Sequence, residues 1–372
     1  MSQLLNILAS KNKEKKSAAF LDYINSKAAE KRIPLIGHFE LTPRCTLNCR
    51  MCYVHLDKST KQFIELKTEE WLSLFDQAID AGMMYATLSG GECFLRDDFR
   101  AIYEYLQSRG VVVSVMTNGT LIDEEKVTWL ARRPPKLIQL SVYGSSPVGY
   151  ARVTGVAEAF KRVDKAIDLL LETNISLRLA VTYSKQMIPD FEATLNYCNS
   201  KKGGITGVSP YLVEAREDTS RFSKNYMPSL DEQIALYRIM QKVMRTTGNV
   251  YFADEVKCVE SLHNNIDFLP EQGTICAAGI NKFSIAWNGK MTPCNIFDYA
   301  GRYPLEEGFC NSWRFINEKC KQYKNPRECI NCESNKYCIS CPGVHYMKSG
   351  EGHANPDICF LANQMVKENI FI

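Results

Sequence analysis

The sequence predicts an α/β fold: an open, partial (β/α)6 TIM-like barrel, followed by a cysteine-rich C-terminal domain. Between about residues 35 and 215, six short apolar segments of strand length alternate with helical stretches. Repeated strand–helix units favour a parallel sheet with right-handed crossovers, and six units are too few to close an eight-stranded barrel. Beyond residue 250 the chain changes character, because ten of its fifteen cysteines lie there among turn-forming residues.

Residues 1–34 are expected to form a helical extension ahead of the barrel. Apolar residues recur there at helical spacing, namely Phe20, Leu21, Ile24 and Ala28. A basic patch precedes them, consisting of Lys11, Lys13, Lys15 and Lys16. We interpret this patch as a solvated face rather than as a docking site for an acidic peptide.

The barrel is expected to span residues 35–250. Its six candidate strands are Leu35–Leu41, Tyr85–Ser89, Val111–Thr117, Leu137–Val142, Ile175–Thr182 and Thr206–Val213. The first crossover helix is expected to be capped by Thr68, with Glu69 and Glu70 in its first turn. Its apolar face consists of Trp71, Leu74, Phe75, Ala78 and Ile79. The active site of such a barrel lies where the strands end and the loops begin.

The composition is that of a globular metalloenzyme. With 372 residues and 45% hydrophobic content, the chain can bury one large core or two smaller ones. A net charge of +3 gives no reason to expect nucleic-acid binding. The N-terminus has no signal-peptide pattern, and no segment is long enough to span a membrane. Because disulfides suit small secreted domains, the cysteines are expected to be reduced, cytoplasmic and metal-bound.

The most informative feature is the C-x3-C-x2-C run of Cys45, Cys49 and Cys52. Thiolates favour iron–sulfur clusters, and three ligands leave one iron of a 4Fe–4S cluster without a protein partner. Such an open iron can bind a small molecule, as a catalytic cluster requires. With the aromatic Tyr53 straight after the third cysteine, the run resembles that of the radical S-adenosylmethionine (SAM) enzymes.

A second segment that resembles this family follows the second candidate strand. It contains Gly90, Gly91 and Glu92. Two glycines allow a bound ligand to approach the backbone closely, and a glutamate can pair with an ammonium group. The resemblance implies that this segment holds the amino group of SAM. Cys93 comes next and is interpreted as a bystander, with a fourth cluster ligand as the alternative.

Further contacts to SAM are implied by the resemblance. Asn118, in a Thr-Asn-Gly turn that closes the third strand, either lies near the site or forms a plain turn. Ser141, at the end of the fourth strand, resembles the family's hydroxyl contact to SAM. Arg152 or Arg178 would hold the carboxylate, with an ordinary surface ion pair as the alternative for each. Tyr53 would flank the adenine, or else it is a core aromatic residue.

The chemistry also follows from the family resemblance. SAM binds the open iron through its amino and carboxylate groups. One electron from the reduced cluster cleaves a carbon–sulfur bond and leaves methionine and a 5′-deoxyadenosyl radical, which takes a hydrogen atom from an unactivated C–H bond. The cofactor performs this hard step, and the protein positions the target atom.

Residues 251–372 carry a second set of cysteines that resembles the SPASM extension of radical SAM enzymes, which holds two auxiliary 4Fe–4S clusters. Carried over by position, the ligands of the first auxiliary cluster are Cys276, Cys294 and Cys341. Those of the second are Cys329, Cys332, Cys338 and Cys359. The expected cofactors are therefore SAM and three 4Fe–4S clusters.

Two departures from the SPASM pattern leave alternatives open. Cys338 and Cys341 are separated by two residues where the family usually has three. The first auxiliary cluster also lacks an obvious fourth ligand, which could be Cys258, the substrate or a non-cysteine group. The alternative to the clusters is a structural zinc site with the ligands Cys329, Cys332, Cys338 and Cys341. The remaining groups are interpreted as free thiols or solvated imidazoles: Cys310, Cys320, His345 and His353.

The SPASM resemblance implies a peptide or small-protein substrate. The favoured reaction is maturation of a ribosomally made (RiPP) peptide by crosslink formation, because a two-electron oxidation gives the auxiliary clusters a task as electron acceptors. The N-terminal 34 residues are too short for a leader-binding domain. A separate leader-peptide recognition protein, or direct docking on the barrel, is therefore expected. A flavodoxin- or ferredoxin-type protein would supply the electrons.

Three other functions are alternatives to peptide crosslinking. Anaerobic sulfatase maturation, which generates formylglycine, uses an aspartate as base after an auxiliary-cluster cysteine, whereas Asn295 follows Cys294 here and an amide cannot act as a base. Asp298 could substitute only if the loop differs. Tetrapyrrole or small-cofactor synthesis is neither favoured nor excluded by any residue. A non-enzymatic iron–sulfur or zinc scaffold is least favoured, since it needs neither an open iron nor a SAM-binding segment.

Overall fold

Nine strands form one curved sheet in the computed structural model, which describes residues 20–54, 64–201, 205–209, 226–247, 250–252, 270–334, 338 and 341–370. The strands are β1 (Ile36–Glu40), β2 (Tyr85–Ser89), β3 (Val112–Thr117), β4 (Leu137–Val142), β5 (Leu177–Thr182), β6 (Ile205–Ser209), β7 (Val250–Phe252), β8 (Lys282–Ile285) and β9 (Met291–Thr292). The six predicted strands are thus confirmed as β1 to β6, and the last four positions of the sixth prediction lie outside the described residues.

The sheet is parallel from β7 to β8, and β9 joins β8 in antiparallel orientation. The spatial order is β7-β6-β5-β4-β3-β2-β1-β8-β9. Strands β7 and β9 are therefore the two edges, and the barrel is open as predicted. The sequence did not predict β7, β8 or β9, which are only two to four residues long.

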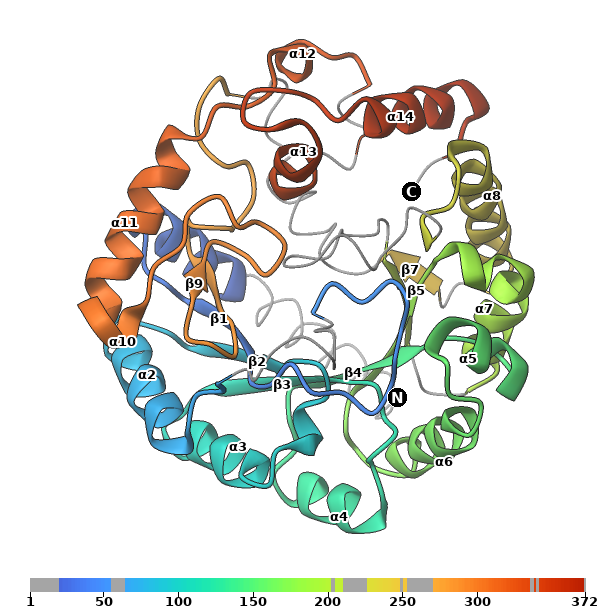
Figure 1. Cartoon of the computed structure of the whole chain (residues 1–372), viewed down its shortest axis with the longest axis horizontal. Coiled ribbons are helices and arrows are strands. Elements are labelled where there is room, and N and C mark those ends of the chain that lie inside the picture. Colours follow the sequence, from blue (N-terminus) through green and yellow to red (C-terminus); the bar gives the residue numbers. More distant parts are fainter. Residues whose placement is uncertain are drawn as a thin grey trace, which may run out of the picture.

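Helices cover the outer, convex face of this sheet (Figure 1). The barrel helices are α2 (Thr68–Asp80), α3 (Phe99–Ser108), α4 (Glu124–Arg132), α5 (Pro147–Thr154), α6 (Ala159–Leu171), α7 (Phe191–Ser200) and α8 (Leu230–Thr247), with 3-10 turns η1 (Cys93–Leu95) and η2 (Lys185–Asp190). The later helices are α10 (Pro304–Glu307), α11 (Phe309–Gln322), α12 (Arg327–Ile330), α13 (Pro342–Ser349) and α14 (Pro356–Glu368). None of the helices in the described part of the chain is long and apolar enough to cross a membrane.

Helix α2 shows how an amphipathic sequence pattern leads to packing against the sheet. Its predicted apolar face is buried, and Phe75 meets Phe39 of β1 edge to face, with ring centroids 4.9 Å apart. The predicted cap is wrong by one position: Lys67 is the N-cap, and its N–H donates to the Glu70 carboxylate at 2.7 Å. Thr68 is instead the first helical residue, and its hydroxyl donates to the side chain of Asp98.

The cysteine-rich region closes the open side of the barrel. Strand β8 pairs with β1, and Phe283 of β8 packs edge to face on Phe39, with centroids 5.7 Å apart. On the other side, Arg238 of α8 donates two hydrogen bonds of 2.7 Å to Glu368 of α14. Helices α12 and α14 lie between α11 and α8 around the rim, and α13 lies toward the inside (Figure 1). The division at residue 250 stays a prediction.

The expected N-terminal helix is present over residues 20–31. Ala28 is buried, whereas Phe20 is largely exposed. The indole N–H of Trp313, on α11, donates to the carbonyl of Arg32 at 2.8 Å and so joins the end of this helix to the C-terminal region. The predicted lysine patch and Cys258 lie outside the described residues.

Candidate active site

The carboxyl ends of the first strands meet at one edge of the sheet, where most of the predicted SAM-site residues lie. Parallel pairing places Glu40 of β1 beside Ser89 of β2, and Thr117 of β3 beside Leu140 of β4. The cysteine loop (residues 45–52) follows β1, the glycine pair follows β2 and Asn118 follows β3. Segments far apart in the sequence are thereby brought to one site.

The three thiols of the cysteine loop are neighbours and are shielded from water to different degrees. Cys49 is buried, whereas Cys45 and Cys52 are half-buried. The N–H of Asn48 donates to the carbonyl of Thr154 at 3.0 Å, which holds the loop against the end of α5. Burial raises the pKa of Cys49 well above its usual value, and the nearby Cys52 and Cys45 raise it further. A positively charged group beside Cys49, such as a metal ion, would favour its thiolate form.

The glycine pair packs against the segment that leads into the cysteine loop. The N–H of Gly91 donates to the carbonyl of Thr42 at 2.7 Å, and the N–H of Glu92 donates to that of Arg44 at 2.8 Å. A Cβ on Gly90 would lie 2.5 Å from the Thr42 oxygen, and one on Gly91 would lie 2.3 Å from the Arg44 oxygen. The space beside these glycines is therefore filled by the chain itself, so the pair positions the cysteine loop.

Glu92 is completely buried, and protein donors surround its carboxylate. Its Oε2 accepts from the N–H of Asn118 at 2.8 Å, and its Oε1 accepts from the N–H of Phe94 at 3.2 Å. The Thr117 hydroxyl lies 2.8 and 2.9 Å from the two oxygens. Burial raises the pKa of Glu92, and the hydrogen bond from Asn118 opposes this rise. The carboxylate thus ties together the loops after β2 and β3, and its pairing with the amino group of SAM stays a prediction.

Asn118 is buried and contacts the cysteine loop directly. Its Oδ1 accepts from the N–H of Thr120 at 2.9 Å and from the Thr120 hydroxyl at 2.6 Å. Its Nδ2 lies 3.0 Å from the hydroxyl of Thr46 and 3.4 Å from the Sγ of Cys45. Asn118 therefore does more than form a turn, because its side chain connects the end of β3 to the first cysteine.

On β4, Ser141 is linked to the cysteine loop through Tyr143, a residue that the sequence analysis did not single out. Tyr143 forms hydrogen bonds with Ser141 and with Cys49. Burial raises the pKa of Tyr143 well above its usual value, so the phenol keeps its proton. The predicted contact of Ser141 with SAM stays a prediction.

Arg152 lies on α5, where its Nη1 is 3.0 Å from the Oδ2 of Asp190 at the end of η2. Both side chains are half-buried. The ion pair that the sequence left open as an alternative is thus formed, and a bound carboxylate would have to compete with Asp190. The other candidate, Arg178, lies on β5 beside Gln139 of β4.

Tyr53 connects the cysteine loop to the C-terminal region. Its hydroxyl accepts a hydrogen bond of 2.9 Å from the Nδ2 of Asn295, 242 positions away in the sequence. The Oδ1 of Asn295 lies 3.1 Å from the Sγ of the preceding Cys294. Asp298 is exposed and forms an ion pair of 2.8 Å with Lys290. One asparagine therefore contacts both Tyr53, at the end of the cysteine loop, and a C-terminal thiol.

One group of C-terminal cysteines consists of Cys276, Cys294 and Cys341. Burial raises the pKa of the Cys276 thiol, and interactions with Cys341 and then with Cys294 raise it further. Cys276 and Cys294 also pack against the small apolar cluster of Ala278, Phe297 and Tyr323. These three thiols are thus neighbours, and Cys341 lies with Cys276 although its sequence neighbour is Cys338.

A second group consists of Cys329, Cys332, Cys338 and Cys359. Burial raises the pKa of Cys338 to about 12, with contributions from Cys329, Cys359 and Cys332. Cys359 is likewise influenced by Cys332. A zinc site of Cys329, Cys332, Cys338 and Cys341 would need Cys341 in this second group. Cys341 instead interacts with Cys276 of the first group, which disfavours the zinc site.

The donor chemistry of these groups fits iron–sulfur clusters. Within the described residues, no three His, Cys, Asp or Glu side chains surround a position for a single ion. A 4Fe–4S cluster does not require such a position, because each thiolate binds a different iron atom and the ligands stand further apart than those of one ion. Thiols that are mostly buried or half-buried, with an amide donor beside Cys45, are a suitable ligand set.

Residues 39–198 match the radical SAM superfamily. This part of the chain is a radical SAM domain. The match begins within β1 and ends in α7, so it contains the cysteine loop, Glu92, Asn118 and Ser141. The protein is therefore a radical SAM enzyme, which uses SAM together with an iron–sulfur cluster.

Similarity to other radical SAM proteins extends over most of the chain. It is 23% identical over 336 residues to the PqqA peptide cyclase of Rhizobium meliloti (strain 1021), covering 88% of this chain and 87% of that protein. It is 20% identical over 346 residues to the AdoMet-dependent heme synthase of Oleidesulfovibrio alaskensis, covering 86% of each. The fold is shared with Streptococcus suis SuiB bound to its precursor peptide SuiA, with a TM-score of 0.67 and 17% identity over 91% of this chain and 79% of SuiB.

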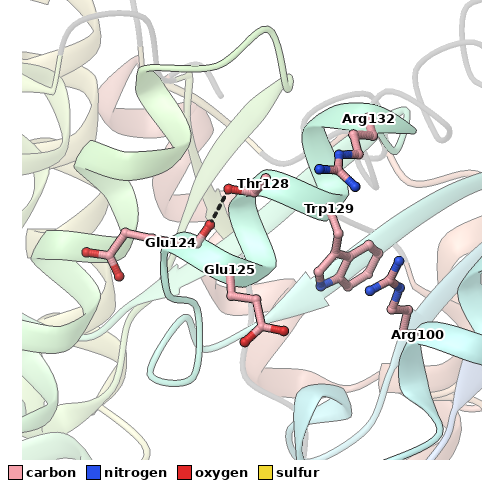
Figure 2. Close-up of a pocket in the computed structure, with 6 residues that line it drawn as sticks. All are labelled: Arg100, Glu124, Glu125, Thr128, Trp129 and Arg132. Carbon is pink, nitrogen blue, oxygen red and sulfur yellow. Dashed lines mark hydrogen bonds between the residues drawn. The ribbon is translucent and has the colours of Figure 1, made fainter.

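A surface pocket of about 340 Å³ lies away from these thiols, in the outer helical layer between α3 and α4. Figure 2 shows the guanidinium of Arg100 beside the indole of Trp129, at 5.6 Å from the ring centroid. Glu124, Glu125 and Arg132 complete the charged lining. Because α3 and α4 cover the convex face of the sheet, the pocket takes no part in the chemistry of this radical SAM site.

Sequence reasoning missed several residues that hold the site together. Thr46 and Thr120 adjoin the recognised motifs, and hydroxyls beside a motif are a weak signal because such residues are common in loops. Tyr143 was missed although it follows β4 directly, two positions after Ser141. His345 was expected in a solvated loop, but it is buried in α13.

Proposed function

We propose that this radical SAM enzyme oxidatively modifies a peptide, most simply by forming a crosslink within a ribosomally made precursor. The observation that carries the proposal is the similarity to a peptide cyclase over 88% of this chain, a share too large to be confined to the barrel. The shared fold with SuiB supports it, since that protein was crystallised with its precursor peptide.

In this proposal Cys45, Cys49 and Cys52 bind the SAM-cleaving cluster. When bound, the cluster supplies the electron that cleaves SAM, and the resulting 5′-deoxyadenosyl radical removes a hydrogen atom from the peptide. The protein's own contribution is positional. Glu92 holds the ends of β2 and β3 in register. Asn118 and Tyr143 orient the thiols of the cysteine loop. The Gly90–Gly91 pair keeps this loop close to the sheet.

Two auxiliary clusters are proposed in the C-terminal region, bound by the two cysteine groups described above. Grouping of Cys341 with Cys276 and Cys294, rather than with Cys338, supports the assignment carried over from the SPASM pattern. Their proposed task is to accept the second electron when the peptide is oxidised. A separate recognition protein for the leader peptide and a flavodoxin- or ferredoxin-type reductant complete the proposed set of partners.

The first experiment tests the site. Simultaneous replacement of Cys45, Cys49 and Cys52 by alanine should abolish the formation of 5′-deoxyadenosine and remove about four irons per chain, the content of one 4Fe–4S cluster. Iron in the C-terminal region should remain. The matched control replaces Cys198, which is buried in the core on α7. It should keep both the formation of 5′-deoxyadenosine and the full iron content. Retained SAM cleavage in the triple variant would overturn the proposal.

The second experiment tests the reaction. The reconstituted enzyme is incubated anaerobically with a strong reductant, SAM and a short peptide encoded beside its gene, and deoxyadenosine and peptide mass are measured together. Deoxyadenosine with a two-hydrogen mass loss on the peptide supports crosslinking. Deoxyadenosine with an unchanged mass would reject crosslinking of that peptide and direct attention to epimerisation.

A tetrapyrrole substrate is the second candidate, because a relative of nearly full coverage is a heme synthase. The two candidates differ in what must fit between the barrel and the C-terminal region: a planar macrocycle or an extended chain. Binding of a porphyrin to the apo enzyme, followed by its Soret absorbance, separates them. Tight porphyrin binding that a peptide does not displace would favour the second candidate.

A further inference from the structure

The amide orientation of Asn118 is determined by its neighbours. Its Oδ1 lies 2.9 Å from the backbone nitrogen of Thr120, a group that can only donate. The atom that faces this N–H must therefore be the amide oxygen, and the amide nitrogen must face the cysteine loop. The side chain is buried, so water does not offer an alternative partner.

Two hydroxyls close a ring of hydrogen bonds with this amide. Thr120 Oγ1 lies 2.6 Å from Asn118 Oδ1, which only accepts, so Thr120 donates its proton there. Thr46 Oγ1 lies 2.6 Å from Thr120 Oγ1, and because the Thr120 proton is already used, Thr46 donates to Thr120. Thr46 Oγ1 then accepts one N–H of Asn118 at 3.0 Å. Each of the three side chains donates once and accepts once within the ring.

One amide N–H remains, and it faces Cys45. The distance from Nδ2 of Asn118 to Sγ of Cys45 is 3.4 Å, and the same sulfur accepts the N–H of Leu47 at 3.4 Å. The donor is held from behind, because the backbone N–H of Asn118 is bound to the buried carboxylate of Glu92 at 2.8 Å. Hydrogen bonds to a cluster's sulfur ligands favour its more negative, reduced form and so raise its reduction potential.

We propose that Asn118 is a positioning residue that raises the reduction potential of the SAM-cleaving cluster by donating its second amide N–H to the Cys45 thiolate. This inference rests on the proposed role of Cys45 as a cluster ligand. It assigns to Asn118 a task that differs from a contact with SAM, because both N–H groups and both acceptor positions of the amide are already engaged within the protein.

The test compares two substitutions in the reconstituted full-length enzyme. Asn118→Ala removes the N–H donor to Cys45. Thr46→Val opens the ring of hydrogen bonds but leaves that donor in place, so it is the matched control for a loosened loop. The reduced fraction of the SAM-cleaving cluster is followed by electron paramagnetic resonance during a redox titration without SAM. Signals of other clusters are subtracted with the variant that lacks Cys45, Cys49 and Cys52.

At a fixed solution potential, Asn118→Ala should lower the ratio of reduced to oxidised cluster roughly three- to tenfold, the effect of one hydrogen bond. A tenfold change corresponds to a shift of about 59 mV for one electron. Thr46→Val should change the ratio less than about twofold, because the hydrogen bond to sulfur is retained. The reduction potential of the cluster depends on how far the Cys45 thiolate charge is stabilised. The rate of SAM cleavage, in contrast, would fall after any disturbance of the site.

An unchanged ratio in Asn118→Ala overturns the inference, and so do equal shifts in both variants. If Asn118→Ala fails to take up its full iron content, Asn118→Asp replaces it, since aspartate keeps the shape and the acceptor for Thr120; an unchanged ratio there is equally decisive. If the triple cysteine variant keeps all of its iron, it is the proposed function that fails, and the role of Asn118 as a donor to a cluster ligand falls with it.

Discussion

Replacing Gly91 by alanine is the most direct test of how the cysteine loop is held. Gly91 does not have a positive φ, so alanine can adopt its backbone conformation. What forbids alanine is space, because a Cβ there would lie 2.3 Å from the Arg44 carbonyl oxygen and 2.7 Å from that of Pro43. Both are backbone atoms and cannot swing away as a flexible side chain would. The segment leading into Cys45 must therefore move.

The cost can be worked out from the contacts that such a movement breaks. The hydrogen bonds from Gly91 to Thr42 (2.7 Å) and from Glu92 to Arg44 (2.8 Å) join the two segments. Losing both costs about 1–3 kcal/mol, at about 0.5–1.5 kcal/mol each. Overpacking against rigid backbone adds about 1–3 kcal/mol. We therefore expect Gly91→Ala to lower the free energy of unfolding by about 2–6 kcal/mol, a large part of the 5–15 kcal/mol that is typical of a folded protein.

Gly110→Ala is the matched control. Gly110 has a φ of +77°, but a Cβ there would meet nothing within 4 Å. It should cost about 1–2 kcal/mol through backbone strain alone and leave the site intact. Anaerobic urea unfolding of the apo protein measures both costs, and iron content after reconstitution measures the site. Only Gly91→Ala should lose iron from the cysteine loop. A Gly91→Ala protein as stable as Gly110→Ala, with full iron, would refute the steric argument.

Two other predictions concern the C-terminal region and its contact with the barrel. The Nδ1 of His345 accepts the N–H of Asn355 at 2.8 Å, and burial lowers the pKa of His345 below its ordinary value of 6.5. Because the unfolded chain then binds the proton more readily, stability is complete above about pH 6.5 and falls as the pH drops below it. Urea unfolding of the apo protein between about pH 5.5 and 7.5 measures how the free energy of unfolding depends on pH. The wild type and the control His353→Gln, at an exposed position, should lose stability as the pH falls, whereas His345→Gln should lose less. If His345→Gln loses as much as the wild type, another group is responsible. Tyr53→Phe should cost about 0.5–1.5 kcal/mol, and Asn295→Ala at least as much because it also loses the contact with Cys294. The double variant should cost no more than Asn295→Ala, since the bond between Tyr53 and Asn295 is already lost in either single variant. Fully additive costs in the double-mutant cycle would contradict that bond.

Much of the barrel could be predicted from the sequence because its signals are local. Apolar segments bounded by turns define β2 and β4 with the same limits as in the structure. Strands β7, β8 and β9 were missed because two to four residues carry no periodicity. The exact N-cap of α2 could not be predicted from the local sequence either. The cap is Lys67 rather than Thr68, because the Thr68 hydroxyl donates to Asp98, thirty positions away in the sequence.

The candidate site also has features that the sequence predicts and features that depend on the tertiary structure. The sequence by itself determined which thiols are available, since the spacing of Cys45, Cys49 and Cys52 places three on one short loop whatever the rest of the chain does. Only the tertiary structure decided which groups face them. The pairing of β8 with β1 brings Asn295 to Tyr53, and the meeting of strand ends turns the amide of Asn118 toward Cys45. Such contacts depend on the register between distant segments, which no local pattern encodes, because hydrogen-bond partners are chosen only after the sheet has brought the loops together.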